Sequence, residues 1–269
     1  MQEYAVSIFS SLSTKSALKK AIKRKEILLN GIPAQTSDWI EEHQKIELVQ
    51  QELPAKKVFS LKLEVIFEDD FMAVINKPAG IPTSGNFFRS IENALPFNLA
   101  KSQEIDALSY PMPVHRLDNP TSGLLLIAKT RNAQTLLNRA FENKEVQKTY
   151  LALVNGQAAG FEVYKNEIEG KYAESEVSLL NTTSIAQGEF SLVQVKPKTG
   201  RTHQIRIHLA SNGFPIVGDR DYGGFLGIKG GLYLASTGVD FLHPISGKSI
   251  NINLPVPEKF REFQSLQQP

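Results

Sequence analysis

The chain has 269 residues, of which 41% are hydrophobic, so it can bury one large core or two modest ones and is not a disordered tail protein. It has no cysteine, which excludes disulfides and thiolate metal sites, and no apolar stretch approaches the about 20 residues that span a membrane. The net charge is only +2, so composition alone does not indicate a nucleic-acid partner. The N-terminus lacks the basic start of a signal peptide, and we expect a cytoplasmic protein.

Residues 1–50 are predicted to form a small separate domain. Ser13 or Thr14 is a suitable N-cap for a helix with an apolar side formed by Ala17, Leu18, Ala21 and Ile22. A short strand ending in Asn30-Gly31 predicts a tight turn, and a second strand at 45–49 completes the domain. The other side of the helix is basic, with no acid between residues 15 and 25: Lys15, Lys19, Lys20, Lys23, Arg24 and Lys25. Such a face binds phosphates even on a nearly neutral protein, although a merely solvated surface would look the same.

After a linker at 51–60, residues 61–269 indicate a larger α+β domain. Apolar runs at 63–67 and 72–75 predict a hairpin, and the spacing within 131–143 predicts a helix. Further strands are expected at 124–128, 150–154, 190–195 and 232–236. Thr202 is expected to cap a helix that ends near Gly213.

Three polar segments of this domain are candidates for chemistry: residues 115–123, 148–150 and 200–208. The first places Asp118 in a turn-rich loop directly before a probable core strand, where reactive groups often lie. Taken alone, each residue has an ordinary explanation, because Asp118 suits a turn, Tyr150 suits a strand and Arg201 suits the surface. His203 and His208 are five residues apart, which is not the spacing of a helical zinc pair, so no metal is predicted. The sequence has no phosphate-binding glycine loop, dinucleotide motif or nucleophile elbow.

The motifs become specific when they are read together. HRLDNPTSGLLLIAKT, which begins at His115, resembles the signature of the RluA family of pseudouridine synthases. The similarity continues in order and covers about residues 61–255: NKPAGIP before the signature, then KTY, GRTHQIRIHLA, PIVGDRDYGG and FLHP after it. Residues 1–50 are similar, more loosely, to the S-four type of RNA-binding domain, with Thr14-Lys15 in place of its usual Ser-Arg pair.

This resemblance implies a catalytic domain built on a mixed, largely antiparallel sheet with a central cleft. It implies isomerisation of uridine to pseudouridine in structured rRNA or tRNA, with no cofactor. We also expect no DNA partner, and a monomer is the default expectation. By motif, Asp118 is the catalytic aspartate, Arg116 displaces the target base from its stack, and Tyr150 packs against the target ring. Arg201 is expected to pair with Asp118 and keep it ionised, since a bidentate guanidinium stabilises a carboxylate in a water-poor pocket. His115 and Leu234 are expected to contact the substrate, together with the basic residues of the first domain.

Two other functions remain open from the residues alone. A catalytically silent RNA-binding protein would explain the basic helix. A glycosidase acting on RNA or nucleosides would need a second carboxylate, and no motif identifies one. The sequence also leaves open whether Asp118 acts as a nucleophile or as a base that removes a sugar proton.

Overall fold

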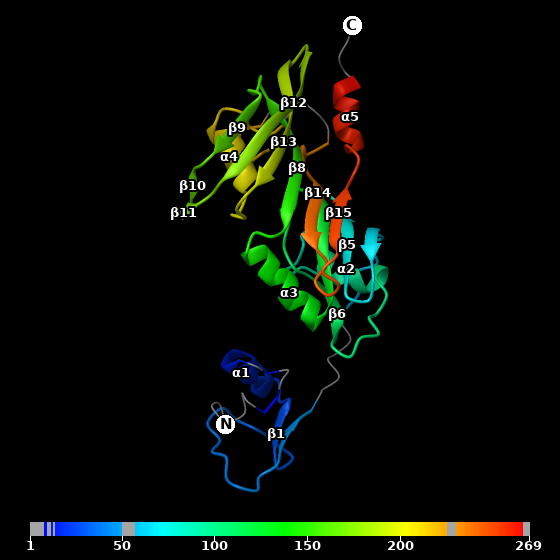
Figure 1. Ribbon diagram of the computed structural model, residues 1–269, viewed down its shortest axis with the longest axis vertical. Coiled ribbons are helices and arrows are strands. Elements are labelled where there is room, and N and C mark those ends of the chain that lie inside the picture. Colours follow the sequence, from blue (N-terminus) through cyan, green and yellow to red (C-terminus); the bar gives the residue numbers. More distant parts are fainter. Residues whose placement is uncertain (1–7, 10–11, 13, 50–56, 225–229, 266–269) are drawn as a thin grey trace. The chain divides into compact units, whose positions relative to one another are not determined.

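The computed structural model describes residues 8–9, 12, 14–49, 57–224 and 230–265. The chain divides into two compact units, Met1–Lys56 and Lys57–Pro269. Figure 1 shows the smaller unit in blue and the larger one in cyan through red. Most of the predicted linker lies outside the described residues. Within the described part of the chain, no helix combines the length and apolar character that crossing a membrane requires.

The smaller unit is one helix packed on a three-stranded antiparallel sheet. Helix α1 (Lys15–Lys23) begins at Thr14, whose hydroxyl accepts a hydrogen bond from the Ala17 N–H at 3.1 Å. The buried side of the helix packs on three strands, β1 (Ile27–Leu29), β2 (Ile32–Pro33) and β3 (Ile46–Leu48). Their order in the sheet is β2-β1-β3. The turn between β1 and β2 has positive φ at both Asn30 (53°) and Gly31 (79°), which those residues tolerate best. The structure thus confirms the predicted helix and turn; Ser13, the alternative cap, lies outside the described residues.

The larger unit is built on one long sheet with strand order β4-β5-β7-β14-β8-β13-β12-β9, to which β6 adds beside β7 and β15 beside β14. The strands are β4 (Glu64–Glu68), β5 (Met72–Lys77), β6 (Ala107–Pro113), β7 (Ser122–Thr130), β8 (Gln147–Asn155), β9 (Phe161–Tyr164), β12 (Ser175–Ile185), β13 (Gly188–Pro197), β14 (Leu234–Leu242) and β15 (Ser249–Asn253). Among the described strands only β7 and β14 pair in parallel. The predicted α+β class with a mixed, largely antiparallel sheet is confirmed.

The remaining elements cover the sheet or extend its loops. They are α2 (Ile91–Asn98), α3 (Arg131–Glu142), the small hairpin β10 (Glu167–Ile168) with β11 (Lys171–Tyr172), α4 (Gln204–Ser211) and α5 (Glu258–Ser265). The expectation that Thr202 caps α4 is wrong. The capping position is His203, in the left-handed region at φ 54°, and its side chain makes no cap hydrogen bond. Instead the Gln204 side chain reaches back, and its oxygen accepts from the Arg201 N–H at 3.0 Å.

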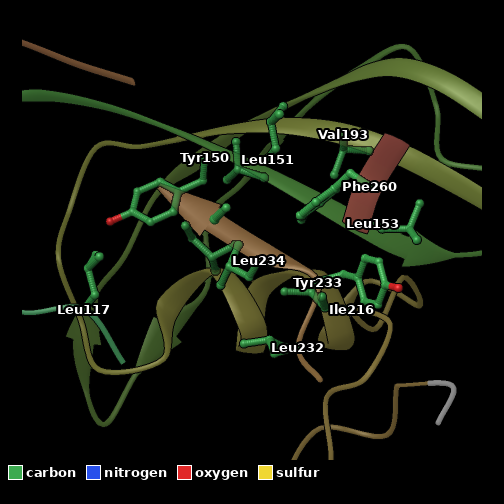
Figure 2. Close-up of a cluster of buried hydrophobic side chains, with 14 of the residues drawn as sticks. Leu117, Tyr150, Leu151, Leu153, Val193, Ile216, Leu232, Tyr233, Leu234 and Phe260 are labelled. Atoms are coloured by element: carbon green, nitrogen blue, oxygen red, sulfur yellow. The ribbon is translucent and has the colours of Figure 1, made fainter. Parts of the chain in front are cut away.

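Both faces of the central sheet are buried, which explains the unbroken apolar run in β7. Leu125 and Ile127 belong to one hydrophobic cluster, whereas Leu124 and Leu126 belong to a second cluster on the opposite face. Figure 2 shows part of the first cluster, where Tyr150 and Leu234 lie next to one another at its edge. The candidate residues are therefore set against a rigid core.

The pairing of three central strands brings the polar motifs together. The β7–β14 register places Gly123 opposite Ser236, and the β8–β14 register places Tyr150 opposite the same serine. Gly123 has φ 116°, and a Cβ atom there would collide with the Ser236 backbone. Glycine is therefore required for the loop after Asp118 to enter the sheet at this point.

Candidate active site

A cavity of about 710 Å³ lies where these strands meet α4. Side chains from all three polar segments line it, including Asp118, Tyr150 and Arg201, and Leu234 closes one side. The cavity is within the size range of small-ligand sites. The fold thus joins segments that lie far apart in the sequence.

Asp118 lies in a loop that a buried lysine holds in place. Lys77, the last residue of β5, is fully buried, and its ammonium donates to three backbone carbonyls: Pro78 at 3.0 Å, Asn119 at 3.2 Å and Thr121 at 2.8 Å. Burial lowers the pKa of Lys77 to about 8, and the nearby negative charge of Asp118 opposes this shift. The Asp118 side chain is 20% exposed, so it is accessible from the cavity without being fully solvated.

The Asp118 loop is also fixed from its other side. Thr83 bonds both backbone groups of Leu117: its hydroxyl donates to the carbonyl at 3.1 Å and accepts from the N–H at 3.2 Å. The Gly80 N–H donates to the Asn119 carbonyl at 2.8 Å. The segment NKPAGIP and the residues just after it therefore support the loop that carries the carboxylate.

Two cationic or titratable groups of the α4 segment face Asp118. His203 Nε2 lies 3.9 Å from Asp118 Oδ1. Arg206 is almost fully buried, and its guanidinium makes a two-point contact with Asp219 at 2.7 and 2.6 Å and a further bond to Asp221 at 2.6 Å. The Asp219 hydrogen bond raises the pKa of Arg206 most strongly, and the charge of Asp118 contributes in the same direction. Arg206 is therefore a fixed cation within electrostatic range of Asp118.

The predicted ion pair between Arg201 and Asp118 is absent from the described residues. Arg201 lies in the exposed turn before α4, and its Nε donates to the Tyr172 carbonyl at 3.1 Å. The second arginine of the GRTHQIR segment, Arg206, is buried on α4 and bonded to Asp219 and Asp221, and the charge of Asp118 adds a smaller rise to its pKa. In the sequence, Arg206 stands next to the apolar Ile205, which was a signal that it could be buried. A buried arginine needs acidic partners, and the PIVGDRDYGG segment contains them.

Tyr150 presents a neutral ring to the cavity. Desolvation raises its pKa to about 12, although a hydrogen bond to Ser236 opposes the shift and the charge of Asp118 adds to it. Figure 2 shows the phenol oxygen directed away from the body of the cluster, with Leu234 beside the ring. The ring can therefore act as an apolar packing surface while its hydroxyl stays hydrogen-bonded.

The two residues before Leu117 differ in their environment. His115 Nε2 accepts from the Leu126 N–H at 3.0 Å, and its ring packs on Phe141 at 4.6 Å. Desolvation and the charge of Lys148 lower the pKa of His115 to about 3, so it is neutral and occupied with backbone bonds. Arg116 is exposed and lines the cavity, which leaves its side chain free to reach a ligand.

The predicted basic face of α1 is exposed, but its members are not equivalent. Arg24 is engaged with Glu26 through two contacts of 2.5 and 2.7 Å. A second cavity, of about 610 Å³, is lined by three of the lysines and by the segment after β2: Lys19, Lys23, Lys25, Pro33, Ala34, Gln35 and Thr36. Lys15 and Lys20 lie on the exposed surface of the same helix.

Comparison with known proteins identifies the class. Residues 71–211 match the RNA pseudouridylate synthase family. Ribosomal large subunit pseudouridine synthase D of Xanthomonas campestris is 32% identical, with 94% of this chain and 84% of that protein covered. Ribosomal large subunit pseudouridine synthase C of Vibrio parahaemolyticus is 33% identical, with coverages of 92% and 81%. The solved structure of human RNA pseudouridylate synthase domain containing 1 shares the fold, with a TM-score of 0.61, 23% identity and coverages of 76% and 86%.

The chain therefore belongs to the RNA pseudouridylate synthase family, in its RluA branch. This confirms the sequence-based prediction of an enzyme that isomerises uridine in RNA to pseudouridine.

Lys77→Met is expected to remove the hydrogen bonds that the ammonium donates to the Pro78 carbonyl and to the Asn119 and Thr121 carbonyls of the Asp118 loop, while the Asn119 carbonyl keeps the bond from the Gly80 N–H. We expect a loss of about 2–4 kcal/mol of stability and a fall in kcat of roughly tenfold or more. Lys129→Met is the matched control, because Lys129 is equally buried but bonds Glu68 at 2.7 Å, in the β4–β5 hairpin. Urea unfolding and pseudouridine formation would be measured on both. Loss of kcat in both variants alike would contradict a specific anchoring role.

Arg206→Lys is expected to lower kcat by roughly tenfold or more, because an ammonium cannot reproduce the two-point contact with Asp219 that aims the charge at Asp118. Arg201→Lys is expected to stay within about threefold, since that side chain makes a single bond to a carbonyl. Single-turnover rates on the same RNA give the comparison. A larger loss for Arg201→Lys than for Arg206→Lys would restore the pairing expected from sequence.

Proposed function

We propose that this protein converts uridine to pseudouridine in the RNA of the large ribosomal subunit, with Asp118 as the catalytic carboxylate. The observation that carries the proposal is the partly exposed carboxylate in a nucleotide-sized cavity formed by all three polar motifs. The substrate is inferred from the relatives, which are ribosomal large subunit pseudouridine synthases. A tRNA target remains the alternative within the same chemistry.

The reaction is an isomerisation, so atoms balance within one nucleotide. The bond between N1 and C1′ breaks, the uracil turns, a bond forms between C5 and C1′, and the C5 proton is lost while N1 gains one. Asp118 acts on the ribose either as a nucleophile or as a base. Both routes need an ionised carboxylate.

Tyr150 and Leu234 form the apolar wall against which the detached uracil is held. Because the pKa of Tyr150 is raised to about 12, its phenol stays neutral at physiological pH and presents its ring to the base. A bound uracil packed on this ring keeps its place while it rotates. Arg116, exposed at the same cavity, is suited to fill the gap that an extruded base leaves in the RNA.

The smaller unit is proposed to be an S-four-like RNA-binding domain. Its exposed lysines on α1 and the adjoining cavity offer sequence-independent phosphate contacts. Residues 1–50 would then carry RNA affinity and residues 61–269 the chemistry. We further propose a monomeric cytoplasmic protein with no DNA partner.

Asp118→Asn is expected to abolish pseudouridine formation on an unmodified large-subunit rRNA transcript and to leave RNA affinity within about threefold, because the neutral amide keeps the shape but not the charge. Glu142→Gln is the control: Glu142 is the other acid among the described residues lining the cavity. Nucleoside chromatography with mass spectrometry distinguishes pseudouridine, free uracil and no product. Free uracil that depends on Glu142 would favour a glycosidase, and no product from wild type would favour a silent RNA-binding protein.

Replacing Lys19, Lys20 and Lys23 together by glutamine is expected to weaken RNA binding and to make it less sensitive to salt, since fewer counterions are released. The single variant Lys45→Gln is the control, because Lys45 is on β3 of the same unit and pairs with Glu47 at 2.7 Å. Affinity would be measured at several salt concentrations. Equal affinity and equal salt dependence for the triple variant and wild type would show that this face is only solvated.

A further inference from the structure

Lys148, the half-buried lysine of the active-site cavity, has no counter-charge among the residues that the structure describes. Of the basic residues that line the cavity, Arg206 is held by Asp219 and Asp221, and Lys198 pairs with Glu176 at 2.9 Å. Lys148 is half-buried, yet it makes no ion pair and no side-chain hydrogen bond with any residue that the structure describes. Its ammonium lies 6.0 Å from the centre of the Phe141 ring. This group is absent from the mechanism outlined above.

The strand geometry places Lys148 beside the uracil wall. Lys148 and Tyr150 are two residues apart on β8, so their side chains leave the same face of the strand, and both line the cavity. Their Cα atoms are separated by about 7 Å along the strand. A single nucleotide carries its phosphate and its base at the two ends of one ribose, a separation of the same order. A uridine whose base packs on Tyr150 therefore reaches Lys148 with its phosphate.

The described protein groups around Lys148 do not neutralise its charge. Desolvation lowers the pKa of Lys148, and no carboxylate among the described residues pairs with it to offset that cost. Its titratable neighbour His115 is neutral, as shown by its pKa of about 3, so it neither competes for an anion nor supplies one. A bound phosphate would provide the missing negative charge and recover part of the desolvation cost.

We propose that Lys148 binds a phosphate that flanks the target uridine and thereby positions its ribose against Asp118. Lys148 is then a positioning residue, because it touches the substrate backbone rather than the reacting atoms. The inference rests on the proposed function, and it adds a phosphate subsite to the same cavity.

A combined protein and RNA substitution tests this contact. Wild type, Lys148→Met and Lys148→Arg would be assayed on an RNA whose target uridine has been mapped, and on two RNAs with a neutral methylphosphonate at the linkage on one or the other side of that uridine. Lys248→Met is the control, because Lys248 is exposed on the β14–β15 turn and outside the cavity. Thermal unfolding would show that each variant is folded, and removal of an unpaired charge should not lower Tm.

On natural RNA we expect Lys148→Met to lower kcat/KM roughly tenfold or more, Lys148→Arg to stay within about threefold, and Lys248→Met to match wild type. With the methylphosphonate at the contacted linkage, wild type should fall to the level of Lys148→Met, and the two should then be equal. A Lys148→Met defect that is the same on all three RNAs, or no defect on natural RNA, would overturn the proposal.

Binding of a single-stranded oligouridylate separates this inference from the proposed function. The plot of log affinity against log salt concentration should be shallower by about 0.7 for Lys148→Met, as expected for one lost phosphate contact on single-stranded RNA. If wild type formed no pseudouridine on any RNA, the proposed function would fail. The difference in slope between wild type and Lys148→Met would still show whether Lys148 contacts a phosphate. An unchanged slope would then reject the phosphate subsite.

Discussion

A single buried ammonium group determines where Asp118 lies. Lys77 ends β5 directly beside the start of β7, and its three bonds go to the carbonyl of the adjacent Pro78 and to the Asn119 and Thr121 carbonyls of the Asp118 loop. The loop cannot move without leaving a charge unpaired in the core, which is far more costly than losing a neutral contact. A turn sequence rich in Asn, Pro and Gly, which would otherwise be adaptable, is held in one conformation. The carboxylate is therefore preorganised before any RNA arrives.

The charges around Asp118 are ordered by burial. Asp219 is completely buried and fixes Arg206 through two bonds, so Arg206 cannot swing out to form a full ion pair with Asp118. Asp118, 20% exposed, takes no direct bond from Arg206, so its oxygens remain accessible from the cavity. An arginine bonded directly to Asp118 would stabilise the anion more strongly but would also occupy the atoms that react. Arg201, in contrast, donates a hydrogen bond to a backbone carbonyl and lines the cavity.

The two units have different electrostatic properties. On α1 the basic side chains are exposed to solvent, where each phosphate contact is weak and readily screened by salt. In the cavity Lys148 is half-buried and has no counter-charge among the described residues, and a single phosphate contact there is worth more and is more demanding in geometry. Under the proposed function, general affinity for RNA and placement of one nucleotide would be supplied by separate sets of lysines.

Local signals in the sequence determined much of the secondary structure and pointed to the candidate site residues. Thr14 with the helical spacing after it gave α1, Asn30-Gly31 gave the first turn, and the motif around Asp118 indicated the family and its reaction. Only the tertiary structure decided which arginine faces Asp118, why Lys77 is buried and that Lys148 lacks a partner. The physical reason is that caps and turns are bonds between residues a few positions apart, whereas the partners of Arg206 and Lys77 come from segments that meet only when the sheet has formed.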